Sequence, residues 1–150
     1  MSEILGIVKF ALSKVYDNHI YLIENKVSER SIVFWFGIYF FEIIKETEYS
    51  EFNLDVEYNR NQKGPKRTKN NPHGTYPDLI LHNRGRNDNN ILAIEFKPWW
   101  NPGTEDDLIK LQDFTNPDGE YKYEIGLSIL IGRETPSGKI VKNGEVTGDL

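Results

Sequence analysis

Three charged residues of the types used in hydrolysis lie at the same end of two apolar segments. Asp78 opens the run LILH, and Glu95 and Lys97 close the run ILAI, with a polar loop between the two runs. Glu95 and Lys97 are two residues apart, so in a strand their side chains leave the same face of the sheet. If the two runs pair through a loop centred near residue 87, Asp78 falls opposite residue 95, 96 or 97. The sequence therefore predicts two carboxylates and an ammonium group at one end of a sheet.

This arrangement favours a bound divalent cation. Two carboxylates repel each other unless a positive group lies between them, and Mg²⁺ takes oxygen ligands while it keeps several waters. A cation held in this way polarises a phosphate and lowers the pKa of a bound water, and a nearby lysine orients that water or offsets developing charge. The chemistry indicated by the three residues is phosphodiester hydrolysis, with Mg²⁺ or Mn²⁺ as the cofactor.

Two helices are predicted before the first strand. Residues 3 to 23 carry apolar side chains at helical spacing. Ser28 is expected to cap a second helix, because Val27 and Ile32 occupy the two positions of a hydrophobic staple. The run from Ile32 to Ile44 is apolar almost all round, so this helix should be covered on more than one side.

Strands and a third helix follow. Residues 52 to 58 alternate between apolar and polar side chains, as in a half-buried strand. Residues 78 to 83 and 91 to 97 form the pair of strands that carries the charged residues. Thr104 and Asp107 predict a capping box for a helix, the alternating segment 123 to 131 predicts another strand, and Asn143 with Gly144 indicates a C-terminal hairpin.

The order of elements is therefore α-α-β-β-β-α-β with a small hairpin at the end. This order predicts an α/β or α+β fold in which a central mixed sheet is flanked by helices. A chain of 150 residues is most simply a single domain, here residues 1–150.

Composition excludes several classes of protein. The chain has no cysteine, which rules out disulfides and thiolate metal sites and fits the reducing cytoplasm, the expected location. The N-terminus has an acid at position 3 and no basic segment, so it is not a signal peptide. The longest apolar run, Ile32 to Phe41, is too short to cross a bilayer, so no membrane association is expected.

One basic segment stands out from this acidic chain. The net charge of −5 argues against binding of nucleic acid by the surface as a whole. Between Asn59 and Pro77, however, the chain has no Asp or Glu and carries five basic residues: Arg60, Lys63, Lys66, Arg67 and Lys69. The segment leads directly into the Asp78 strand, so we expect it to hold a nucleic-acid backbone beside the metal. A solvated surface loop is the alternative.

The quoted motifs resemble the PD-(D/E)XK nuclease superfamily. Asp78 follows Pro77, and Glu95-Phe96-Lys97 follows an apolar strand. The resemblance implies that Asp78 and Glu95 hold the metal with help from the carbonyl of Phe96, and that Lys97 is the catalytic lysine.

The resemblance covers the core order helix, strand, hairpin, helix, strand over about residues 28 to 131 and implies a restriction-endonuclease-like fold. Many members add a Glu from the first core helix, which here implies Glu29. Glu42 lies on the same helix, and an acid in the first turn can also serve only to offset the helix dipole.

The leading hypothesis is a hydrolase, a metal-dependent endonuclease that acts on DNA. The alternative is a noncatalytic nucleic-acid-binding or protein-interaction module that keeps the fold, although the intact charged residues argue against it. The second helix also predicts a homodimer, because it carries more aromatic side chains than one small sheet covers: Phe34, Trp35, Phe36, Tyr39, Phe40 and Phe41.

Four other residues allow two interpretations each. Lys110 could contact phosphate, but a solvated helix face is the expected position. Glu57, on the polar face of its strand, is expected to be solvated rather than a metal ligand. Trp99 and Trp100 could stack on bases, and the closing of a core is favoured for at least one of them.

Overall fold

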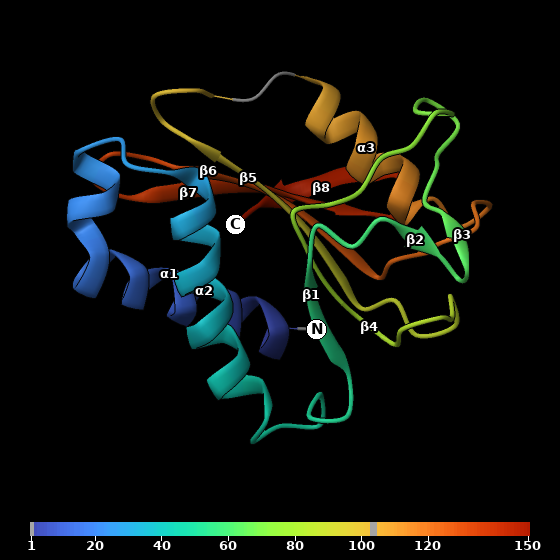
Figure 1. Ribbon diagram of the computed structural model, residues 1–150, viewed down its shortest axis with the longest axis horizontal. Helices are drawn as coiled ribbons and strands as arrows, with labels where there is room; N and C mark the ends of the chain where they lie inside the picture. Colours follow the sequence, from blue (N-terminus) through green and yellow to red (C-terminus); the bar gives the residue numbers. More distant parts are fainter. Residues whose placement is uncertain (1, 103–104) are drawn as a thin grey trace.

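The computed structural model describes residues 2–102 and 105–150, which form an α+β fold (Figure 1). The helices are α1 (Ser2–Glu24), α2 (Glu29–Ile44) and α3 (Glu105–Thr115). The strands are β1 (Asn53–Val56), β2 (Arg60–Asn61), β3 (Gly64–Pro65), β4 (Leu79–His82), β5 (Leu92–Pro98), β6 (Ile125–Ile131), β7 (Pro136–Lys142) and β8 (Glu145–Asp149). Of the described helices, none combines the length and the hydropathy that a membrane span requires.

Six strands form one mixed sheet, in the order β1-β4-β5-β6-β7-β8. Strands β5 and β6 run parallel because α3 carries the chain back between them, whereas the other neighbours in the sheet are antiparallel. The predicted mixed sheet is confirmed. So is the C-terminal hairpin, which turns at Asn143 and Gly144 with φ angles of 51° and 79°, as a tight hairpin turn requires.

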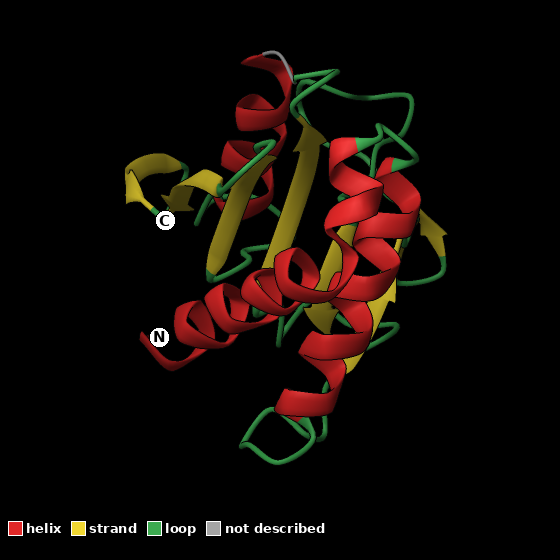
Figure 2. Ribbon diagram, turned by 90° about the vertical axis from the view of Figure 1, so that its left-hand side faces the viewer, coloured by secondary structure: helices red, strands yellow, loops and turns green. Residues whose placement is uncertain are grey.

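The central strands of the sheet, β4, β5 and β6, are buried on both faces. Helices α1 and α2 cover one face, and α3 covers the other (Figures 1 and 2). Because side chains alternate along a strand, Ile94 and Phe96 of β5 join the α1–α2 core while Ala93 packs under α3. Glu95 and Lys97 share the face of Ala93. The charged end of β5 is therefore directed toward the α3 side.

The start of α2 brings an acid to the end of the sheet. The hydroxyl of Ser28 accepts a hydrogen bond from the backbone N–H of Ser31 at 3.4 Å, so the predicted cap is confirmed. Inside the helix, Phe36 is buried and lies edge-on to the ring of Phe96, with 5.0 Å between centroids. This packing fixes α2 against β5. Glu29 is consequently held at the N-terminus of a rigid helix.

Three sequence predictions need correction or restriction. The predicted strand 52–58 is shorter, because Glu57 adopts a left-handed backbone conformation with φ of 49° and ends the pairing. The basic segment contains the small antiparallel ribbon β2–β3, which the pattern did not indicate. Thr104, the expected partner in the capping box, lies outside the described residues.

Candidate functional site

The pairing of β4 with β5 places Asp78 next to Glu95. Leu79 pairs with Ile94, so Asp78 and Glu95 follow at the next register position. Asp78 Oδ2 accepts a hydrogen bond of 2.7 Å from the backbone N–H of Phe96. The carbonyl of Asp78 accepts another, 3.0 Å long, from the N–H of Glu57. Asp78 is thus fixed from both neighbouring strands.

Glu95 is a buried carboxylate. Its side chain is 2% exposed, and burial, together with the nearby charge of Asp78, raises its pKa to about 8. Oε1 of Glu95 lies 2.6 Å from Nζ of Lys110 on α3. A carboxylate that is so poorly solvated requires a positive partner, and in this structure the ammonium group of Lys110 provides it.

Lys97 lies beside the same group and is partly open to solvent. Its side chain is 33% exposed, and its Nζ is 3.7 Å from Oδ2 of Asp107. Burial alone would lower its pKa, but the carboxylates of Asp107, Glu29 and Asp78 raise it above the ordinary value. Lys97 is therefore a charged lysine at neutral pH, with an accessible ammonium group.

Glu29 belongs to the same cluster, whereas Glu42 does not. Burial raises the pKa of Glu29, and the charge of Asp78 raises it further. Glu29 and Asp78 also line one groove. Glu42 is exposed and lies about 20 Å further along the axis of α2 at 1.5 Å per residue. The structure thus brings together Asp78, Glu95, Lys97 and Glu29.

The cluster contains more acidic than basic side chains, which favours the binding of a cation. Four carboxylates face the two ammonium groups of Lys97 and Lys110, an excess of two negative charges when all are ionised. Oε1 of Glu95 and Oδ2 of Asp107 are buried and accept no well-aligned hydrogen bond. Within the described residues, no three Asp, Glu, His or Cys side chains form a metal-binding group. A site here would rest on one or two carboxylates and waters, as Mg²⁺ sites commonly do.

Two residues of α3 were not expected at the site. Lys110 is only 19% exposed, so the expectation of a solvated helix face is wrong. Asp107 is buried against Lys97 rather than serving only as a helix cap. Both positions share a helical face with the buried Leu111 and Phe114. This spacing could have predicted that Asp107 and Lys110 face the sheet, because residues on the face of Leu111 and Phe114 point toward it.

Lys66 is buried, so its predicted contact with nucleic acid is wrong. The side chain is 2% exposed, and its Nζ lies over four aromatic rings at 4.6 to 5.7 Å. The rings belong to Tyr58, Phe114, Tyr121 and Tyr123. Burial lowers the pKa of Lys66 to about 8. Contacts with the ring faces offset part of the desolvation, and Lys66 anchors the basic segment to the α3 side of the fold.

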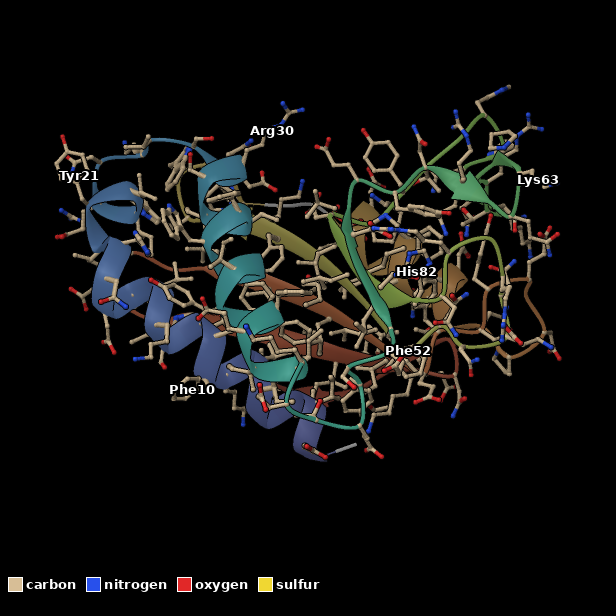
Figure 3. All side chains as sticks on the ribbon, turned by 60° about the horizontal axis from the view of Figure 1, so that its bottom comes forward. Phe10, Tyr21, Arg30, Phe52, Lys63 and His82 are labelled. Atoms are coloured by element: carbon tan, nitrogen blue, oxygen red, sulfur yellow. The ribbon has the colours of Figure 1, made fainter. Side chains whose placement is uncertain are left out.

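The other four basic residues of the segment are exposed, namely Arg60, Lys63, Arg67 and Lys69. The backbone around them is held in place, since the amide of Asn70 donates to Asp113 at 2.8 Å and the backbone N–H of Arg67 donates to the hydroxyl of Tyr121 at 2.8 Å. In Figure 3, Lys63 lies on the turn of the β2–β3 hairpin and Arg30 lies on α2, along the same edge of the molecule. The basic segment is an ordered surface.

An open groove continues from the cluster between α2 and β1. It has a volume of about 750 Å³ and is lined by Glu29 and Asp78 at one end. The exposed side chains of Phe34, Ile38, Phe41 and Val56 form its apolar part. Glu57 also lines it, with Oε1 3.5 Å from a guanidinium nitrogen of Arg30. The side chain of Glu57 is 45% exposed, so the expectation that it is solvated is confirmed.

Both tryptophans that follow β5 pack against the α1–α2 core. The indole N–H of Trp99 donates to the carbonyl of Ile23 at 3.0 Å, which ties the end of β5 to α1. Trp100 lies edge-on to Trp99 with 5.8 Å between ring centroids. The interpretation that these residues close a core is confirmed for Trp99.

Comparisons with family models, curated proteins and solved structures found no match to this chain.

Proposed function

We propose that this chain is a cytoplasmic, metal-dependent endonuclease that hydrolyses phosphodiester bonds in DNA. The observation that carries the proposal is the convergence of Asp78, Glu95 and Lys97 at one sheet end, where the carboxyl group of Glu95 is buried beside Asp78. The order helix, strand, hairpin, helix, strand, implied by the resemblance to PD-(D/E)XK nucleases, agrees with the observed order of elements. A restriction-endonuclease-like fold is part of the proposal.

Asp78 and Glu95 are the residues that would hold the cation. The N–H and C=O of one strand residue point to the same neighbouring strand, so the Phe96 carbonyl also turns toward Asp78 and is a suitable third ligand. A bound Mg²⁺ or Mn²⁺ would supply polarisation of the phosphate and a more acidic water. Glu29, at the start of α2, would add a third carboxylate near the cation.

Lys97 contributes a positive charge next to the carboxylates. Its ammonium group can donate a hydrogen bond to the attacking water or to the phosphate, which orients the water and offsets the charge that develops on the phosphate. The water gives up a proton to solvent as its oxygen forms a bond to phosphorus, while the bond from phosphorus to the leaving sugar oxygen breaks. The leaving oxygen then takes up a proton from solvent.

Cleavage of a panel of DNA substrates tests this proposal. Linear, nicked, flapped and four-way DNA would be incubated with the protein in Mg²⁺, in Mn²⁺ and in EDTA. We expect cleavage of at least one substrate with either metal and none in EDTA. Undiminished cleavage in EDTA would contradict a metal-dependent mechanism.

A noncatalytic module is the second candidate, and the apolar groove between α2 and β1 is the observation that favours it. Such a module would bind nucleic acid or protein through this surface and cleave nothing. The DNA panel separates the two, since a module would retain its DNA complexes in Mn²⁺ without product.

The basic segment should contribute nonspecific, salt-dependent binding. Changing both Lys63 and Lys69 to Gln should flatten the slope of log affinity against log salt by up to about two units, since each phosphate contact contributes roughly −0.9 for duplex DNA. Electrophoretic mobility shifts in Ca²⁺ at several salt concentrations measure the slope.

Two controls accompany that measurement. Changing exposed Lys9 and Lys45 to Gln alters the net charge equally, away from the segment, and should leave the slope unchanged. Lys66→Met should also leave it unchanged, because the buried ammonium group cannot reach phosphate. Equal slopes for wild type and the Lys63/Lys69 variant would return the segment to the role of a solvated surface.

We also propose a homodimer formed through the groove surface. Phe34 and Phe41 are 57% and 51% exposed, although Phe36 and Phe40 of the same helix are buried within the chain. Light scattering at high concentration should give the mass of a dimer, and changing Phe34 and Phe41 to Ser should give a monomer. Phe10→Ser is the matched control, because Phe10 is 52% exposed on α1 and does not line the groove. A monomer mass for the wild type contradicts the proposal.

A further inference from the structure

The contact between Lys110 and Glu95 places a cation of the protein at the proposed metal site. Nζ of Lys110 is 2.6 Å from Oε1 of Glu95, and the two side chains are 19% and 2% exposed. A lysine side chain on a helix usually keeps its ammonium group in water, and it gives up this contact only for a strong anionic partner. Lys110 is therefore part of the site and not of the helix surface.

The chain offers Lys110 a second anionic partner. Asp107 lies three residues earlier on α3, on the same helical face. Burial raises the pKa of Asp107, and the nearby charges of Lys97 and Lys110 oppose part of that rise. Oδ2 of Asp107 is buried and accepts no well-aligned hydrogen bond. A small change in side-chain rotamer would move the ammonium group from Glu95 toward Asp107 and keep it paired.

We propose that Lys110 is a positioning residue that acts as the built-in counter-cation of Glu95 and competes with the divalent metal for this carboxylate. The inference rests on the proposed metal site. In the metal-free protein, Lys110 neutralises Glu95 and holds it in place. When a metal binds Glu95, the ammonium group shifts toward Asp107, because two cations repel each other strongly at such short separation.

This competition predicts two effects of Lys110→Met with opposite signs. Removing a positive charge beside the ligands should tighten Mn²⁺ binding by about tenfold or more. In EDTA above pH 8, where Glu95 is ionised, the same change leaves a buried carboxylate without its partner, so the melting temperature should fall by about 5 to 10 °C. Added Mn²⁺ should restore the lost thermal stability. A side chain with only a structural role would lower the melting temperature without tightening metal binding.

Electron paramagnetic resonance of free Mn²⁺ and thermal unfolding test the inference on wild type, Lys110→Met and the charge-conserving Lys110→Arg. Tighter binding by Lys110→Met, with Lys110→Arg close to wild type, is the expected result. If wild type binds Mn²⁺ too weakly to detect, measurable binding by Lys110→Met also supports the competition. Weaker or equal binding by Lys110→Met, while wild type binds, overturns only the competition. No binding by any of the three overturns the metal site and the competition together.

Discussion

Asp78→Asn should reduce DNA cleavage by about 10³-fold or more while the protein remains folded. The Asn side chain keeps an oxygen that can accept the hydrogen bond from the N–H of Phe96, so the pairing of β4 with β5 should survive. A neutral amide, however, removes the charge that would hold a divalent cation between Asp78 and Glu95. Single-turnover cleavage in Mn²⁺ of the substrate that wild type cuts best gives the rate.

Asp17→Asn is the control for this change, since Asp17 is exposed on α1 and should not affect the rate. Circular dichroism and the melting temperature in EDTA show whether each variant is folded. A wild-type rate for a folded Asp78→Asn protein would exclude Asp78 from the reaction.

Glu95→Gln should abolish cleavage and yet stabilise the metal-free protein at alkaline pH. In the folded state the pKa of Glu95 is raised to about 8, from 4.5 for an unperturbed side chain. Below both values the carboxyl is protonated in both the folded and the unfolded state, and no energetic cost arises. As the pH rises from 4.5 to about 8, the unfolded state ionises freely and the folded state does not, so wild type loses stability.

Gln carries no charge and should avoid this loss. At about 1.4 kcal/mol for each pKa unit, the rise from 4.5 to about 8 gives Glu95→Gln an advantage of up to about 5 kcal/mol above pH 8, and this advantage should vanish near pH 4.5. Urea unfolding in EDTA at both ends of this range measures it. If wild type is the more stable protein at the alkaline end, Glu95 is not a strained buried carboxylate. A substitution that removes activity while it increases stability is common at functional sites.

The core of the site could be predicted because it depends on local rules. Alternation along β5 places Glu95 and Lys97 on one face, and the apolar runs fix the register that brings Asp78 beside them. The N-cap at Ser28 fixes the start of α2 and therefore the position of Glu29. Each of these positions depends only on neighbouring strands or on a single helix turn, so it can be predicted from the sequence pattern.

The parts of the site that were missed depend on tertiary packing. Lys66 lies in a cage of rings from three separate segments, and no local pattern distinguishes it from Lys63 or Lys69, which are exposed. Lys110 was assigned to the solvated face of α3 because charged residues usually lie there. Its spacing from Leu111 and Phe114 indicated the opposite, and only the crossing of α3 over β5 shows that the buried face meets Glu95.

The fold itself was predictable in order and less so in detail. The periodicity gave the helices, the main strands and the hairpin, but the left-handed residue Glu57 ended β1 early, and the two-residue strands β2 and β3 are too short to leave a pattern. The expectation that α2 is covered on more than one side was met only in part. Phe34 and Phe41 remain exposed on the groove.

Binding of Mn²⁺ in the absence of DNA tests the central claim most directly. Electron paramagnetic resonance counts the free ion in titrations of wild type, Asp78→Asn and the Asp78→Asn/Glu95→Gln double variant. A metal held by these two carboxylates predicts saturable binding by wild type, clearly weaker binding by the single variant and none by the double variant. Equal binding by all three proteins, or no binding by either wild type or Lys110→Met at any accessible concentration, would contradict a metal site formed by Asp78 and Glu95.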